Sequence, residues 1–128
     1  MALLVSVNNL TDFKVSNVFV RRIIKSVFLN EGIRDAEISV AFLSESEIKS
    51  INMKYRNKNK ATDVLSFLLD QEKMIGEIII CPTKVKSNLS QVLVHGCLHL
   101  LGYDHEKGQK ERDLMRIEED FYLSCQII

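Results

Sequence analysis

The stretch that decides the fold is residues 90–105, SQVLVHGCLHLLGYDH. From Ser90 to Leu101 the residues are apolar almost all round, apart from Gln91 and two histidines. A helix that is hydrophobic on every side is normally buried in a core rather than laid on a surface. The sequence therefore predicts a central buried helix, which the rest of the chain has to cover.

Three histidines lie in the same stretch, four and then six residues apart: His95, His99 and His105. On a helix, His95 and His99 project from the same face one turn apart, close enough to share one ion. Gly102 can take a positive φ, end the helix and let the following turn bring His105 back toward the pair. This spacing predicts a metal site at the end of the buried helix.

Three neutral imidazoles suit Zn²⁺, although other divalent transition metals accept the same ligands. Three protein ligands leave a fourth tetrahedral position open, which is typical of a catalytic site rather than a structural one. The cysteines, Cys81, Cys97 and Cys125, are not spaced to supply a fourth ligand. Metzincin proteases share the histidine spacing but have Glu after the first His, where this chain has Gly96. Peptide hydrolysis is therefore disfavoured.

Strands and helices alternate around the central helix. Alternating or continuous apolar runs predict four strands, at residues 3–7, 36–43, 64–69 and 75–81, the last two able to pair as a hairpin. Helical spacing predicts three further helices, at about 14–30, 44–56 and 110–125. The fold class is therefore α/β (α+β), a single domain with a mixed four-stranded sheet and about four to five helices.

The same spacing assigns inner faces to two of these helices. For 44–56, which begins with a capping box from Ser44 to Glu47, the inner residues are Ile48, Ile51 and Tyr55. For 110–125 the inner residues are Leu114, Ile117, Phe121 and Cys125.

Length and composition bound the class of protein. At 128 residues, with 46% hydrophobic and 27% charged residues, the chain is ordinary for one soluble globular domain. Residues 1–10 lack the basic region and apolar length of a signal peptide, and no apolar run is long enough for a membrane span. Widely spaced cysteines are typical of buried thiols in a reducing compartment. We expect a cytoplasmic protein with no membrane partner.

Charge is balanced over the whole chain, with 17 basic and 17 acidic residues, but not locally. Between Lys49 and Lys60 there are five cations and no acid, whereas residues 104–120 hold seven acids and four bases. A basic patch attracts phosphates even at zero net charge, although a solvated helix end explains these cations equally well. Arg56 could hold a phosphate in bidentate fashion if the fold brings it near the histidines.

Four other polar residues have both a structural and a functional explanation. Thr62, Asp63 and Ser66, at the start of the third strand, could orient a substrate or cap a turn. Asp104 could hydrogen-bond to an imidazole N–H behind the metal or form a turn. The sequence contains no nucleophile elbow, phosphate-binding loop or dinucleotide fingerprint.

Two segments resemble signatures of the YbeY family of metal-dependent endoribonucleases: HGCLHLLGYDH at 95–105 and INMKYRNKNKATDVLSF at 51–67. The strand from Gly76 to Cys81 is also similar to the family, and order and spacing agree over roughly residues 36–125.

The resemblance implies an α/β fold, one zinc ion held by His95, His99 and His105, and Arg56 as the catalytic arginine. It further implies cleavage of single-stranded RNA, maturation of the 16S rRNA 3′ end and ribosome quality control.

We therefore expect residues 1–128 to form one metallohydrolase domain that acts as a zinc-dependent endoribonuclease in rRNA processing. Arg56 and His95 are the candidate catalytic residues, because the signature holds no obvious general base and a histidine could fill that role. The expected partners are RNA and the ribosome or its proteins, and not DNA. Two alternatives stay open. One is a ribosome-assembly factor that binds RNA through residues 49–60 and holds a structural metal, and the other is a metallohydrolase of small esters or peptides.

Overall fold

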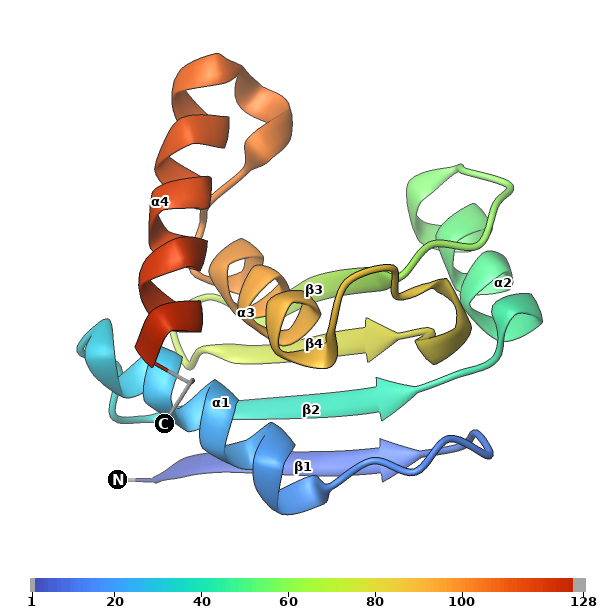
Figure 1. The fold of residues 1–128 in the computed structure, drawn as a ribbon, viewed down its shortest axis with the longest axis horizontal. Coiled ribbons are helices and arrows are strands. Elements are labelled where there is room, and N and C mark those ends of the chain that lie inside the picture. Colours follow the sequence, from blue (N-terminus) through green and yellow to red (C-terminus); the bar gives the residue numbers. More distant parts are fainter. Residues whose placement is uncertain (1, 126–128) are drawn as a thin grey trace.

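A mixed four-stranded sheet forms the centre of the molecule (Figure 1). The structure, a computed structural model, describes residues 2–125, except for the side chains of His105 and Cys125. The strands are β1 (Leu3–Asn9), β2 (Ala36–Phe42), β3 (Val64–Asp70) and β4 (Ile75–Ile80). Their order across the sheet is β1-β2-β4-β3, with β1, β2 and β4 parallel and β3 antiparallel to β4.

Four α-helices join or follow the strands within the described range. They are α1 (Asn17–Asn30), α2 (Glu45–Arg56), α3 (Leu89–Leu100) and α4 (Gln109–Cys125). Two 3₁₀ turns span Pro82–Lys84 and His105–Lys107. The predicted single α/β domain with a mixed sheet is therefore confirmed. No helix within residues 2–125 combines the length and hydropathy that crossing a membrane would require.

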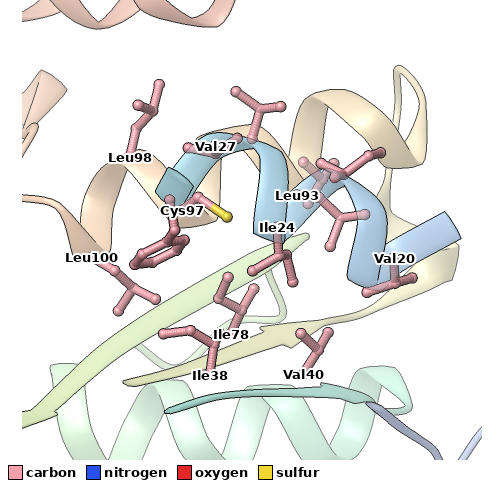
Figure 2. Packing of buried hydrophobic residues seen from close by; sticks show 14 of the residues in the cluster. Val20, Ile24, Val27, Ile38, Val40, Ile78, Leu93, Cys97, Leu98 and Leu100 are labelled. Carbon is pink, nitrogen blue, oxygen red and sulfur yellow. The ribbon is translucent and has the colours of Figure 1, made fainter. Parts of the chain in front are cut away.

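α3 is buried, as its composition predicts. α1 and α3 lie on the same face of the sheet (Figure 1), and their inner side chains interdigitate with strand residues beneath them (Figure 2). The cluster includes Val20, Ile24 and Val27 of α1, Ile38 and Val40 of β2, Ile78 of β4, and Leu93, Cys97, Leu98 and Leu100 of α3. Each fully buried side chain of this size contributes about 1.5–3 kcal/mol, so this cluster fixes the position of α3 on the sheet.

α2 covers one end of the opposite face. Ile48 is fully buried in a second cluster with Leu43, Leu65, Ile79 and Cys81. The predicted capping box is present: the Ser44 hydroxyl accepts from the Glu47 backbone N–H at 3.3 Å, and the Glu47 carboxylate accepts from the Ser44 N–H at 3.2 Å. The prediction that Tyr55 faces inward is wrong, since its side chain is 62% exposed.

The rest of that face is left uncovered. Leu4 and Ser6 of β1 and Glu37 and Ser39 of β2, together with Ile75, line a shallow groove of about 330 Å³. β1 is also an edge strand, paired with β2 alone. The half of the sheet formed by β1 and β2 is therefore covered by helices on one face only.

α4 packs on α3 through a different face from the predicted one. Leu114, Ile117 and Phe121 are between 44% and 61% exposed, whereas Met115 and Tyr122 are buried. A shift of one residue turns a helix face by about 100°, so the predicted stripe points largely to solvent. The predicted inner residue Cys125 lies outside the described side chains.

One hydrogen-bonding group fixes α4 to the end of α1. The Tyr122 hydroxyl donates to a Glu31 carboxylate oxygen at 2.8 Å and accepts from the Asn30 side-chain amide at 2.9 Å. α4 is thus held at two places: Tyr122 bonds to the end of α1, and the helix also packs on α3, which carries the histidines.

Candidate functional site

A cleft of about 530 Å³ lies where the two signature segments meet. His95 and His99 of α3 line it together with Arg56, at the end of α2, and Ser66 of β3. The sequence could not show that Arg56 and the histidines are close. The fold brings them to the same cleft because Arg56, the last residue of α2, contacts β3 at Ser66, and α3 packs across β3 and β4.

The two helical histidines are placed as their spacing predicts. Their ring centroids are 4.7 Å apart, with the ring planes at 67°. Asn88 caps the start of α3, and its side-chain oxygen accepts from the Gln91 N–H at 2.9 Å. The helix ends before Gly102, which has the predicted positive φ of 102°. Both imidazoles and Gly102 line the cleft.

The third predicted ligand, His105, begins the 3₁₀ turn after α3, but its side chain lies outside the described residues. Among the described side chains, no group of three or more His, Cys, Asp or Glu residues is placed to hold a metal ion. The His95, His99 and His105 ligand set therefore stays a prediction.

A carboxylate that the sequence did not reveal contacts His95. Glu119 of α4 places Oε1 2.7 Å from His95 Nδ1, and the two side chains are 15% and 26% exposed. An ionised carboxylate can only accept, so Nδ1 carries the proton and the lone pair of the neutral ring is on Nε2. A metal-binding histidine commonly has this tautomer and this kind of partner, so the donor set fits a metal such as zinc.

Arg56 is held at the rim of the cleft by β3. Its Nη2 donates to the Ser66 carbonyl oxygen at 2.8 Å, and its guanidinium lies over the Phe67 ring, 5.3 Å from the centroid. The Ser66 hydroxyl donates to the Gly96 carbonyl oxygen at 3.1 Å, one residue from His95. Ser66 therefore links Arg56 to the histidine helix, a role for which the sequence had offered only general explanations.

Packing explains why residue 96 is glycine. A Cβ at Gly96 would lie 3.0 Å from Cγ2 of Ile78 and 3.3 Å from Oγ of Ser66. A side chain at this position would therefore require Ile78 or Ser66 to shift by a few tenths of an ångström, and glycine avoids that shift.

Cys97 lies between the two histidines in the sequence but belongs to the core. Its side chain is fully buried, and burial raises the pKa of the thiol well above its usual range. A thiol that keeps its proton is a poor metal ligand. Cys97 therefore packs against the sheet and does not serve the cleft.

The mouth of the cleft carries charges of both signs. Lys58 and Lys60 lie on the side of the α2–β3 loop, and Asp104 and Glu106 lie on the side of the 3₁₀ turn. The Lys58 amine is 3.9 Å from a Glu106 carboxylate oxygen, with both side chains largely exposed. The Asp104 side chain accepts from the Glu106 N–H at 2.9 Å and caps the turn. This is the turn role that the sequence predicted as one of two for Asp104.

Thr62 and Asp63 also line the cleft, at the start of β3. The Thr62 hydroxyl donates to an Asp63 carboxylate oxygen at 3.4 Å, and the Asp63 carbonyl oxygen accepts from the Cys81 N–H at 2.9 Å. Asp63 thus ties the entrance of β3 to the end of β4.

The family model and the similar proteins that match this chain carry the same description. Residues 6–126 match the family described as endoribonuclease YbeY. Three similar proteins carry that description. The one from Persephonella marina is 33% identical over 123 residues, covering 83% of this chain and 80% of that protein. The one from Rubrobacter xylanophilus is 38% identical over 100 residues, covering 74% of each. The one from Thermodesulfovibrio yellowstonii is 45% identical over 103 residues, covering 68% of this chain and 65% of that protein.

A solution structure of a protein from Thermotoga maritima has a similar fold, with a TM-score of 0.60 and 27% sequence identity. The match covers 93% of this chain and 86% of that one. With most of the chain matched in both sequence and fold, this protein belongs to the endoribonuclease YbeY family, whose members hydrolyse RNA phosphodiester bonds.

Proposed function

We propose that this chain holds one divalent metal ion, zinc in the first instance, with His95, His99 and His105, and that it cleaves single-stranded RNA there with the help of Arg56. The cleft carries the proposal, because the guanidinium and the two described imidazoles line the same space. In this proposal residues 1–128 act as one metallohydrolase domain.

When bound, the metal supplies a Lewis acid for a phosphoryl oxygen. The planar N–H donors of Arg56 bind phosphate oxygens and neutralise the charge that builds on phosphorus. The hydrogen bond to Ser66 and the Phe67 ring hold the guanidinium in place for this role. His95 stays the candidate general base for the moments when its Nε2 is not bound to the metal, because Nδ1 is held by Glu119.

Charge at the mouth favours one path for the strand. Lys60 attracts backbone phosphates toward the part of the cleft that Arg56 lines. Lys58 is 3.9 Å from the Glu106 carboxylate, which offsets part of its attraction for phosphate, and Asp104 repels phosphates.

For the biological substrate we propose the 3′ end of 16S rRNA, as the sequence resemblance implies, with the ribosome and its proteins as partners in rRNA maturation and quality control. The buried free thiols of Cys81 and Cys97 suit a reducing compartment, and we place the protein in the cytoplasm.

Removing one helical ligand tests the metal and the chemistry together. Purified wild-type protein is expected to hold about one equivalent of metal by elemental analysis and to lose ribonuclease activity in chelator. His99→Ala is expected to lose both the metal and the activity. Gln91→Ala, on the same helix, is the matched control and should keep both. Full cleavage by metal-free His99→Ala would end the proposal.

Arg56→Ala separates the enzyme from a ribosome-assembly factor with a structural metal. An enzyme should keep most of its affinity for single-stranded RNA and lose cleavage. Lost binding, with no cleavage by either protein, would favour the assembly factor. Arg22→Ala, an exposed arginine on α1, is the control. A panel of chromogenic esters and peptides tests the remaining alternative, and turnover of those substrates without RNA cleavage would support it.

A further inference from the structure

We propose that Glu119 is a positioning residue: it fixes the tautomer and direction of the His95 ring, and so makes metal binding depend on the docking of α4. This inference rests on the proposed function, because it concerns the same metal site. It adds a residue from the C-terminal helix to a site otherwise built from the two signature segments.

The contact between Glu119 and His95 differs from the other ion pairs of the described chain. Its 2.7 Å length and the low exposure of both side chains indicate a charge-assisted hydrogen bond in a poorly solvated place. The pair Arg116–Asp113, also on α4, is 3.5 Å long with side chains 71% and 46% exposed. Exposed ion pairs of that kind contribute little to stability. A carboxylate shielded from water needs a hydrogen-bond partner to offset its lost hydration.

The position of Glu119 on α4 supports a specific role. Met115, Glu119 and Tyr122 are spaced four and three residues apart, so they share one face of the helix. The two neighbours on this face are buried, and an apolar side chain would be the usual choice between them. A carboxylate here loses part of its hydration, and the His95 N–H, with the two heavy atoms 2.7 Å apart, compensates for that loss.

The chemistry of the pair matches what a metal-binding imidazole requires. With the proton held on Nδ1, the lone pair is on Nε2, and the nearby negative charge makes that nitrogen a stronger donor. Because Glu119 belongs to α4, linkage requires the converse effect: metal binding at His95 must strengthen the docking of α4 by the same factor.

The test compares metal affinity in three forms of the full chain, using Co²⁺ alone as a spectroscopic probe of the metal-free protein. Glu119→Gln keeps the size of the side chain and removes its charge. We expect it to bind Co²⁺ about 10–100-fold more weakly than wild type. Asp120→Asn, which removes the neighbouring exposed carboxylate, should bind like wild type. Glu119→Asp should recover part of the loss, since it restores the charge on a shorter side chain.

Urea unfolding of the metal-free proteins separates positioning from a merely structural role. A structural role would lower the unfolding midpoint of Glu119→Gln and leave Co²⁺ affinity unchanged, and that result would overturn the proposal. Weaker Co²⁺ binding at an unchanged midpoint supports it. Glu119→Gln is nearly isosteric with the wild-type side chain and is expected to fold. The test therefore does not need Glu119→Ala, which would leave a gap on the inner face of α4.

A metal-free measurement distinguishes failure of this inference from failure of the metal site. Nitrogen NMR of the imidazoles, at a pH where free imidazole is neutral, should show His95 protonated on Nδ1 in wild type. Wild-type protein that binds Co²⁺ with His95 protonated on Nε2 would overturn the role of Glu119 alone. Wild-type protein with the Nδ1 proton and no affinity for Co²⁺ would overturn the metal site as well, leaving only a structural hydrogen bond.

Discussion

Asn52 is a buried polar side chain that holds the basic loop beside the cleft. It is 2% exposed, and its side-chain amide donates to the Lys60 carbonyl oxygen at 2.9 Å. The backbone carbonyl oxygen of Asn52 accepts from the Lys58 backbone N–H at 3.2 Å. One residue of α2 therefore fixes both ends of the segment that carries the two lysines.

Replacing this side chain should loosen that segment. Asn52→Ala leaves the Lys60 carbonyl without its partner, and we expect a loss of about 1–3 kcal/mol in the free energy of unfolding, measured in urea. Asn59→Ala, in the same loop but exposed, should change it by less than about 0.5 kcal/mol. Equal losses in the two variants would show that the buried amide does not hold the loop.

Tyr122 gives the fold an alkaline limit. Burial is the main cause that raises the pKa of its phenol above the usual 10.0, and the bond to Glu31 acts in the same direction against the opposing bond from Asn30. The folded state keeps a proton that the unfolded state loses, so the free energy of unfolding should fall as pH rises above about 10. Tyr122→Phe should flatten this fall above about pH 10 in urea titrations.

Tyr55→Phe is the matched control for the pH measurement, since that side chain is exposed and should leave the slope as in wild type. Part of the fall should survive in Tyr122→Phe, because burial and Glu31 also raise the pKa of Tyr103. An unchanged slope in Tyr122→Phe would contradict the assignment.

At the scale of single elements, the sequence predicts well what a helix decides by itself. The capping box of α2 needs only Ser44 and Glu47, and both are found in their predicted roles. The face of α4 is different, because the helix carries two possible stripes. The more apolar one, through Leu114, Ile117 and Phe121, was the natural choice and is exposed.

The buried stripe of α4 could not be recognised because it contains a charge. Glu119 is acceptable there only when His95 is beside it, and His95 is on another helix, 24 residues away in the sequence. Periodicity within one helix carries no information about such a partner. The same limit hid the contacts of Ser66, which join Arg56 to the histidine helix.

The cap of α2 can be tested as an element. Ser44→Ala removes the acceptor of the Glu47 N–H, and we expect the free energy of unfolding in urea to fall by about 1 kcal/mol. Ser50→Ala is the control within the same helix, because the Ser50 hydroxyl only donates back to the Ser46 carbonyl oxygen. A loss as large in Ser50→Ala would mean that the cap is not the source of the effect.

At the scale of the whole molecule, the sequence predicts the hairpin of β3 and β4 but not the order of the sheet. A hairpin is a local pairing, whereas inserting β4 between β2 and β3 depends on how α2 and α3 pack on opposite faces. That insertion brings the two signature segments to one cleft. The meeting of Arg56 with the histidines therefore had to be observed.

The electrostatic character of the cleft predicts a salt-dependent affinity for single-stranded RNA. Each phosphate that a lysine neutralises adds about −0.7 to the slope of log affinity against log salt. Lys60→Gln should therefore reduce the steepness of that slope by about 0.7, in binding titrations without added metal. Lys25→Gln, an exposed lysine on α1, should leave it unchanged. A slope unaffected by Lys60→Gln would place the strand elsewhere.

The single helical layer over one half of the sheet has a consequence for how the molecule opens. β1 has one strand neighbour, and Leu4 on its uncovered face is 54% exposed, whereas Ile78 and Ile80 of β4 are fully buried. Backbone amides of β1 should therefore exchange with deuterated water through small local fluctuations, while those of β4 wait for global unfolding. The edge strand β1 can therefore open locally while β4, beneath the histidine helix, keeps its hydrogen bonds.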